Sequence, residues 1–218
     1  MQSNSPWPHI VVEDFLSKED FKLLSAHPTT HVKATERQSL LNNQVFADGS
    51  VIAQDLSKAV ILGMHDRYHG RSMDWLRHLA PKKAALFEYA DYELVITGKD
   101  CKHRIHDDSW DKLLSIVVYL APEKNTGTIV YDNMEGRNPA VIEWKQNRAL
   151  VFARREGQTW HAYKGDGINN RLALIYNLMT SNRRGVYRAE GTNYSLARAR
   201  KHLGKIGKLF GSRRVRPE

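Results

Sequence analysis

The sequence predicts a mainly β domain with flanking helices, in which an N-terminal helical layer packs outside an antiparallel sandwich or barrel. Short segments rich in aromatic and β-branched residues follow one another from about residue 84 to residue 180, and clusters of Pro, Gly, Asn and Asp separate them. Before this region, from about residue 55 to residue 79, the apolar residues instead recur at helical spacing. The 218 residues, 41% of them hydrophobic, are enough for one core of ordinary size.

The N-terminal part is expected to hold one strand and two helices. The segment HIVVEDFL at 9–16 predicts a short strand and a turn, after which Ser17 can cap a helix. Residues 29–54 are polar and poorly periodic, so a loop with short strands is expected there. Residues 55–79 predict a second helix with a break near Gly70.

Six later segments are expected to be strands of the sandwich. Several are separated by turn-forming clusters such as PEKNTG and GRNPA, which is typical of antiparallel β proteins. The segments span residues 85–98, 112–122, 126–132, 140–154, 158–163 and 171–181.

The net charge of +9 lies entirely in the C-terminal segment. Residues 181–218 hold eleven Lys or Arg and two Glu, so residues 1–180 are neutral. Within this basic extension, Leu, Ile and Phe recur at helical spacing between Lys and Arg, which predicts a basic amphipathic helix. The helix could pack on the domain or contact an anionic membrane surface or glycolipid. Binding to nucleic acid is the least favoured of the three.

The cysteine content and the N-terminus favour a cytoplasmic location. Cys101 is the single cysteine, which excludes an internal disulfide and suits a reducing compartment. The first 15 residues lack the basic and apolar regions of a secretory signal. No apolar run approaches the ~18 residues that a transmembrane helix requires.

Three residues have the chemistry of metal ligands. His106 and Asp108 form an H-x-D pair at the edge of an expected strand, and residues i and i+2 of a strand point to the same side. His161 lies on a later expected strand and would approach the same ion from another wall. Two imidazoles and one carboxylate form the facial triad that holds non-haem Fe(II) and leaves coordination positions open.

Arg171 begins another apolar strand, ten residues after His161. A guanidinium inside a barrel needs an anion, because an unpaired buried charge is costly. Its planar fork suits a carboxylate, which could reach back to the metal. Tyr119 could donate its hydroxyl to the same carboxylate, with plain core packing as the alternative interpretation of that residue.

The ordered set of these residues resembles the Fe(II)/2-oxoglutarate-dependent dioxygenases, particularly the prolyl-4-hydroxylase-like branch. The resemblance implies a double-stranded β-helix, or jelly roll, at about 84–180 within a dioxygenase domain spanning 1–180, followed by the extension 181–218. It rests on HDD at 106–108, LSIVVYLAPEKNTGTIVYD at 114–132, WHAY at 160–163, NRLALIYNL at 170–178 and PHIVVEDFLSKEDFKLL at 8–24.

The same resemblance implies the roles of the site residues. His106, Asp108 and His161 would bind Fe(II), and Arg171 and Tyr119 would bind the C5 carboxylate of 2-oxoglutarate. The implied reaction uses O2 and 2-oxoglutarate as cosubstrate, releases succinate and hydroxylates an unactivated C–H bond, with ascorbate as a candidate stimulant. Asp108 favours hydroxylation, because the halogenases of this family have a small residue at that position.

Other interpretations stay open at this point. His103 could replace His106 as a ligand, although the strand register favours His106. Ala173 departs from the Arg-x-Ser arrangement of some branches, which places more weight on Tyr119. His65 and His69 lie four apart without a nearby third ligand, which predicts a solvated helix face.

Two other functions compete with the dioxygenase. A cupin-like protein would bind metal or ligand without turnover, but it would not require the carboxylate clamp of Arg171. A nucleic-acid demethylase of the same superfamily would need a basic groove on the body, whereas residues 1–180 are neutral. The sequence does not choose among a peptide, an amino acid and a glycan as substrate.

Overall fold

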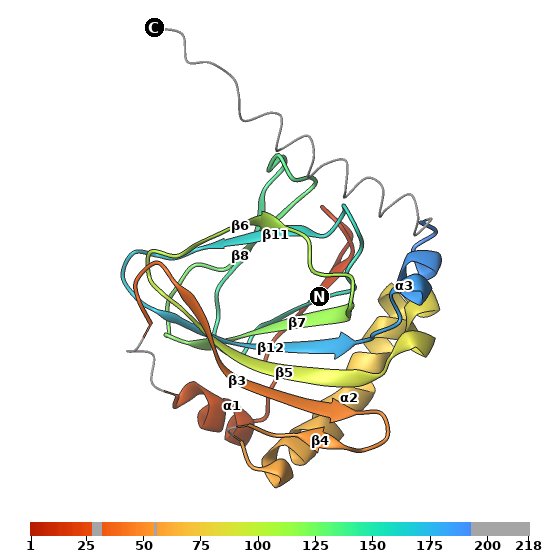
Figure 1. Cartoon of the computed structure of the whole chain (residues 1–218). Helices are drawn as coiled ribbons and strands as arrows, with labels where there is room; N and C mark the ends of the chain where they lie inside the picture. Colours follow the sequence, from red (N-terminus) through yellow and green to blue (C-terminus); the bar gives the residue numbers. More distant parts are fainter. Residues whose placement is uncertain (28–31, 55, 193–218) are drawn as a thin grey trace, which may run out of the picture.

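The computed structural model describes residues 1–27, 32–54 and 56–192, in which two antiparallel sheets face each other (Figure 1). The strands are β1 (Gln2–Ser3), β2 (His9–Val12), β3 (Arg37–Phe46), β4 (Val51–Ile52), β5 (Tyr89–Thr97), β6 (Lys102–His106), β7 (Lys112–Ala121), β8 (Thr128–Tyr131), β9 (Ala140–Ile142), β10 (Ala149–Phe152), β11 (Trp160–Lys164) and β12 (Arg171–Met179). The large sheet has the order β1-β2-β10-β7-β12-β5-β3-β4, and the small sheet has the order β6-β11-β8-β9.

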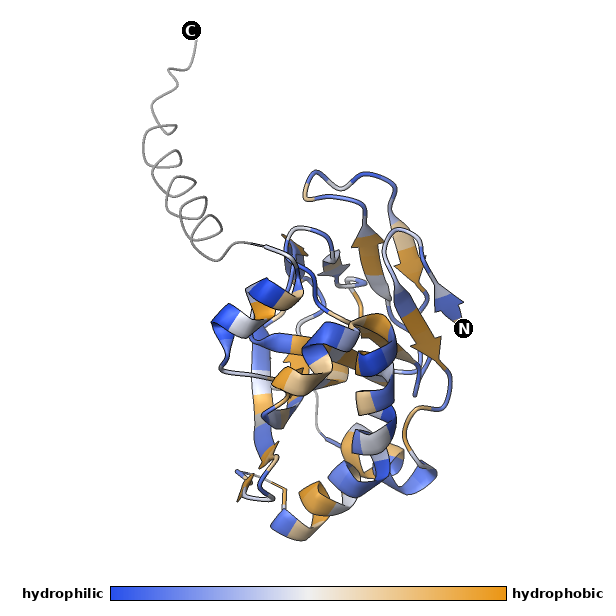
Figure 2. Ribbon diagram, turned by 90° about the vertical axis from the view of Figure 1, so that its right-hand side faces the viewer, coloured by the Kyte–Doolittle hydropathy of each residue, from blue (hydrophilic) through white to orange (hydrophobic). Residues whose placement is uncertain are grey.

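Helices cover the outer face of the large sheet. They are α1 (Lys18–Ser25), α2 (Lys58–Leu79), the 3-10 helix η1 (Pro81–Leu86) and α3 (Arg183–Ala189). Ser17 and Ser57 cap α1 and α2, since each hydroxyl accepts a hydrogen bond from a backbone N–H three residues later. Hydrophilic and hydrophobic residues are mixed along the helices, whereas several strands are largely hydrophobic (Figure 2).

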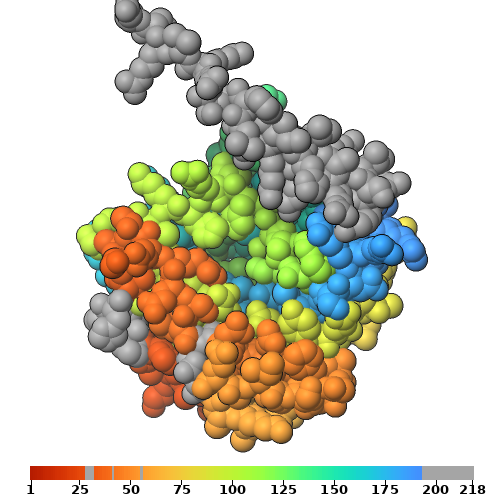
Figure 3. All heavy atoms as spheres, viewed as in Figure 1, coloured from red at the N-terminus to blue at the C-terminus, as the bar shows by residue number. Residues whose placement is uncertain are grey.

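Alternation along β7 divides the interior into two cores. Ile116 and Val118 pack with the helices in the core on the outer face of the large sheet. Val117 and Tyr119 pack between the two sheets, against Val130 of the small sheet. A strand buried on both faces reads as a continuous apolar run, which explains the sequence of this segment. Between the sheets this apolar packing is incomplete, and the surface is hollowed there (Figure 3).

The expectation of a loop with short strands over residues 29–54 is wrong for β3. This ten-residue strand pairs with β5 along its length. The strand lacks a clear apolar alternation in sequence, because a buried position is occupied by Asn43. The side-chain oxygen of Asn43 accepts a hydrogen bond from the backbone N–H of Gln54 at 3.0 Å. Side-chain hydrogen bonding thus replaces the apolar alternation that would have revealed the strand.

Helix α2 differs from expectation in two respects. It runs without interruption through Gly70, where a Cβ atom would meet nothing within 4 Å, so an exposed glycine is tolerated. His65 and His69 do not form a solvated face: they stack on each other at 4.3 Å and are partly buried. The Nδ1 atom of His65 lies 3.2 Å from the hydroxyl of Tyr92 on β5.

The described part of the C-terminal extension packs on the body. Helix α3 contacts η1, and Val186 and Tyr187 are buried. The basic amphipathic helix predicted for the rest of the extension lies outside the described residues, which end at residue 192. In the ranges that the structure describes, none of the helices combines the length and the apolar character needed to cross a bilayer.

Candidate metal centre

A cavity of about 380 Å³ lies between the two sheets. Its walls include His106, Asp108, His161 and Arg171, which are four of the residues that the sequence singled out. This volume lies in the range of small-molecule sites in proteins. The fold therefore brings residues that are spread over 66 positions of the chain together around one cavity.

The three predicted ligands meet on the small sheet. His106 ends β6, Asp108 follows two residues later, and His161 lies on β11 directly opposite His106 in the strand register. The two imidazole centroids are 4.3 Å apart. One donor atom from each of the three residues lies within 4.8 Å of the others, and no second cluster of this kind occurs in the described part of the chain.

Backbone carbonyls fix the tautomers of both histidines. The Nδ1 atom of His106 lies 2.9 Å from the carbonyl oxygen of Arg104, and that of His161 lies 2.9 Å from the carbonyl oxygen of Thr159. A carbonyl only accepts, so each Nδ1 carries a proton and donates it. Each Nε2 atom then keeps its lone pair for a metal ion, which is the usual arrangement of metal-binding histidines.

Asp108 is held as a carboxylate. Burial raises its pKa, but the ammonium group of Lys112 and a hydrogen bond from Ser115 contribute to holding the pKa well below its usual range. The Nζ atom of Lys112 lies 3.0 Å from Oδ1, and the Ser115 hydroxyl donates to Oδ2 at 2.6 Å. Burial also lowers the pKa of His106. A neutral imidazole beside a carboxylate is the protonation state that a divalent metal requires.

His103 lies beside this cluster without joining it. Its ring stacks on that of His106 at 4.2 Å and lines the cavity. Its donor atoms are not among those that lie within 4.8 Å of one another. The geometry therefore favours His106 over His103, as the strand register suggested.

Arg171 is a buried cation without an acidic partner among the described residues. Its side chain is enclosed, and its Nε atom has no hydrogen-bond partner. The guanidinium lies over the ring of Tyr163, 4.2 Å from the ring centroid. Burial lowers the pKa of Arg171, although the group stays protonated at neutral pH. Such a site is prepared for an anion that the protein itself does not supply.

Tyr119 lies behind the cavity wall. Its hydroxyl donates to Thr128 Oγ1 at 2.9 Å and accepts from the backbone N–H of Thr128 at 3.0 Å, and its ring stacks on Trp144. Thr128 and Tyr163 line the cavity instead. The phenol proton is thus already used inside the wall, while the Tyr119 ring lies 5.4 Å from the Arg171 guanidinium. Contact between the Tyr119 hydroxyl and a carboxylate stays a prediction.

The ring nearest the Arg171 guanidinium is that of Tyr163, at 4.2 Å, against 5.4 Å for Tyr119. The Tyr163 hydroxyl donates to Asn125 Oδ1 at 2.8 Å, and a role for this residue was not predicted from the sequence. The available signal was its position two residues after His161 on the same strand. A register irregularity between these two residues prevents the alternation rule from placing Tyr163 with certainty.

Solved structures share this architecture. A prolyl-4-hydroxylase from Pseudomonas putida is 19% identical, with a TM-score of 0.51 over 80% of this chain and 93% of that one. The chain has the fold of the prolyl-4-hydroxylase-like 2-oxoglutarate oxygenases. An oxidoreductase of the 2OG-Fe(II) oxygenase family from Burkholderia pseudomallei is 16% identical, with a TM-score of 0.52 over 80% of this chain and 87% of that one.

The mainly β fold with a jelly-roll core and flanking helices is therefore confirmed. No protein-family model matches the chain, and no curated protein matches it. At these identities the likeness concerns the fold, and the reaction has to be argued from the cavity itself.

Proposed function

We propose that the chain is an Fe(II)- and 2-oxoglutarate-dependent dioxygenase that hydroxylates an unactivated C–H bond. The observation that carries the proposal is the buried guanidinium of Arg171, which has no acidic partner among the described residues and lies in the same cavity as a His–Asp–His cluster. A metal-binding protein without turnover has no need of such a cation, because burying a charge costs free energy. A cosubstrate with two carboxylates could bind Arg171 through one carboxylate and a metal on the His–Asp–His cluster through the other.

The residues present fit both groups. The Nε2 atoms of His106 and His161 and the carboxylate of Asp108 would hold Fe(II), with coordination positions left open. Arg171 would hold the C5 carboxylate of 2-oxoglutarate, beside the ring of Tyr163. When bound, iron and 2-oxoglutarate supply the oxidation, in which O2 is consumed and 2-oxoglutarate becomes succinate and carbon dioxide.

The chain's own contribution is orientation and shielding. Val95, Val117, Ala173 and Ile175 present apolar walls to the cavity, which limits the access of water to the reacting groups. The donor atoms are preorganised for a metal. Backbone carbonyls orient the two histidines, and neighbouring groups hold Asp108 ionised.

Binding measurements with Mn(II), which does not start turnover, test the proposal. We expect the wild-type chain to bind Mn(II) and then 2-oxoglutarate in calorimetric titrations. Arg171→Gln should keep Mn(II) binding and weaken 2-oxoglutarate binding by about 100-fold, because a charged hydrogen-bonded pair is worth ~1.5–3 kcal/mol or more when buried.

Arg71→Gln provides the matched control. Arg71 is also a partly buried guanidinium over aromatic rings, but it lies on α2 against Phe15 and Trp75. It should leave both affinities unchanged. Equal loss of 2-oxoglutarate binding in the two variants, or wild-type binding of Mn(II) without any binding of 2-oxoglutarate, contradicts the proposal and favours a non-catalytic metal-binding protein.

A further inference from the structure

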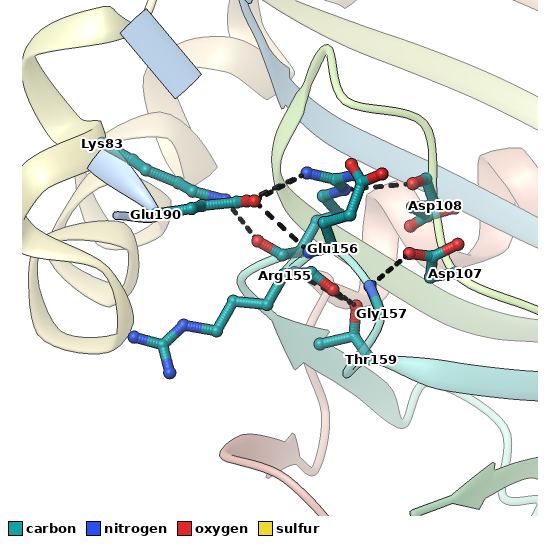
Figure 4. Close-up of polar contacts among 9 residues, drawn as sticks. Lys83, Asp107, Asp108, Arg155, Glu156, Gly157, Thr159 and Glu190 are labelled. Atoms are coloured by element: carbon teal, nitrogen blue, oxygen red, sulfur yellow. Dashed lines mark hydrogen bonds and ion pairs between the residues drawn. The ribbon is translucent and has the colours of Figure 1, made fainter. Parts of the chain in front are cut away.

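A cluster of buried charges lies beside the metal centre, outside the cavity. Lys83 of η1, Arg154 after β10 and Glu190 at the C-terminal end of α3 meet there (Figure 4). Their side chains are only 3 to 5% exposed. The Nζ atom of Lys83 lies 2.5 Å from Glu190 Oε1 and also donates to the backbone carbonyl of Arg154. Glu190 is thus the buried anion that two buried cations share.

Arg154 connects this cluster to the loop that carries Asp108. Its Nη1 atom donates to both carboxylate oxygens of Glu190 at 3.0 and 3.1 Å. Its Nη2 atom donates to Glu156. Its Nε atom donates to the backbone carbonyl of Asp108 at 3.1 Å. Each nitrogen of the guanidinium therefore has a partner, and a planar group held on three sides fixes the atom that it contacts.

A second contact joins the same two segments. The Oδ2 atom of Asp107 accepts a hydrogen bond from the backbone N–H of Gly157 at 2.8 Å, from the turn that leads into β11 (Figure 4). This turn ends at Thr159, whose carbonyl orients the ring of His161. The loop at 106–108 and the segment before His161 are thus connected by a side chain that is not itself one of the candidate metal ligands.

We propose that Glu190 is a positioning residue for the metal centre: by fixing Arg154, it holds the segments of Asp108 and His161 at the separation that one ion requires. Removing the Glu190 charge leaves the ammonium of Lys83 close to the guanidinium of Arg154 in a buried site. Like charges in such a site repel, and Arg154 then loses the contact that orients its donation to Asp108. The inference rests on the proposed function only in taking the His–Asp–His cluster as the metal site.

Mn(II) binding to the full chain tests this inference. We expect Glu190→Gln to weaken Mn(II) binding by about 10- to 100-fold, the range found when partners of metal ligands are removed. Asp107→Ala removes the hydrogen bond to Gly157 and the attraction of the Asp107 carboxylate for Arg154, at a partly exposed position. It should weaken Mn(II) binding by about 10-fold while the chain stays folded. Circular dichroism at the titration temperature establishes that each variant is folded.

Asp20→Asn separates positioning from stability alone. Asp20 is also a buried carboxylate held by an arginine, since Arg67 donates to it at 2.7 and 2.8 Å, but this pair joins α1 to α2 away from the cavity. It should lower the free energy of unfolding and leave Mn(II) affinity unchanged.

The outcomes distinguish this inference from the proposed function. Wild-type affinity for Mn(II) in a folded Glu190→Gln variant, or an equal loss in Asp20→Asn, overturns the positioning role of Glu190 and leaves the proposed function standing. If Glu190→Gln does not fold, Asp107→Ala decides the matter. Failure of the wild-type chain to bind Mn(II) overturns the proposed function, and the inference with it.

Discussion

Arg104 and Thr159 contribute to the candidate metal centre through their backbone carbonyls, which fix the rings of His106 and His161. Spacing along the chain was enough to select three residues that the fold brings together, because ligand type and strand alternation are sequence properties. The carbonyl contacts were not predictable, since they depend on the backbone path within β6 and in the turn before β11. The same limit applies to Tyr119 on β7, whose hydroxyl direction is set by Thr128 on the facing small sheet.

The two tyrosines near Arg171 give a prediction at this scale. Tyr163→Leu removes the ring over which the guanidinium lies, and should weaken 2-oxoglutarate binding to the Mn(II)-loaded chain by about tenfold, because a desolvated cation–π contact is worth ~1–2 kcal/mol. Tyr119→Phe should instead lower the free energy of unfolding by about 1–3 kcal/mol, because it leaves the buried N–H of Thr128 unpaired. Calorimetric titration and urea unfolding measure the two effects. A larger loss of 2-oxoglutarate affinity in Tyr119→Phe than in Tyr163→Leu would instead support the predicted contact between the Tyr119 hydroxyl and the C5 carboxylate.

Elements with a clear apolar period were predictable, whereas β3 was not. The segments around β7 and β12 are continuous apolar runs, because both of their faces are covered. Strand β3 carries Asn43 in a buried position, and its hydrogen bond with Gln54 forms only after the chain has folded. Helix α2 was predicted by its period, but its packing against Tyr92 of β5 and against Phe87, which partly buries His65 and His69, was not.

That contact predicts a pH dependence of stability. Burial lowers the pKa of His65 to about 4 and also lowers the pKa of His69. Both imidazoles stay neutral in the folded chain at pH values where the unfolded chain takes up protons, so folding loses stability as the pH falls from about 6.5 toward 4. The expected loss from the pair is about 1–2 kcal/mol after discounting for solvent screening.

Urea unfolding at several pH values measures this loss. The double variant His65→Gln/His69→Gln should flatten the acid side of the stability profile. His78→Gln, which changes an exposed histidine on the same helix, is the control and should leave the profile as in wild type. A double variant with the wild-type profile would assign the acid sensitivity to other groups.

Charge is distributed unevenly over the whole molecule. The body of 180 residues is neutral, and the surplus of +9 lies in residues 181–218. Glu190 lies in that segment, yet its carboxylate is buried against Lys83 and Arg154 of the body. The first part of the extension therefore belongs to the folded domain, a placement that composition alone could not indicate.

Binding of Mn(II) and 2-oxoglutarate should stabilise the molecule as a unit, because the residues that line the cavity come from both sheets. Mn(II) with 2-oxoglutarate, each at about 100 times its dissociation constant, should stabilise the folded chain by more than the ~2.7 kcal/mol that one such ligand provides. For a chain of this length the melting temperature should rise by roughly 5–10 °C in a thermal scan. Without metal, 2-oxoglutarate should have a much smaller effect. Equal shifts of the melting temperature by 2-oxoglutarate with and without Mn(II) would show that 2-oxoglutarate binds independently of the metal, which contradicts a shared cavity.

The most direct measurement is the formation of succinate from 2-oxoglutarate by the purified chain with Fe(II) and O2. The uncoupled reaction, which proceeds without a second substrate, is followed by mass spectrometry. We expect succinate only when both Fe(II) and O2 are present, and we expect Asp108→Ala, which removes one of three donors, to lower its rate by at least ~100-fold. Absence of succinate from the wild-type chain, even with panels of proline peptides, amino acids and glycans, or an unchanged rate in Asp108→Ala, would contradict the assignment as a dioxygenase.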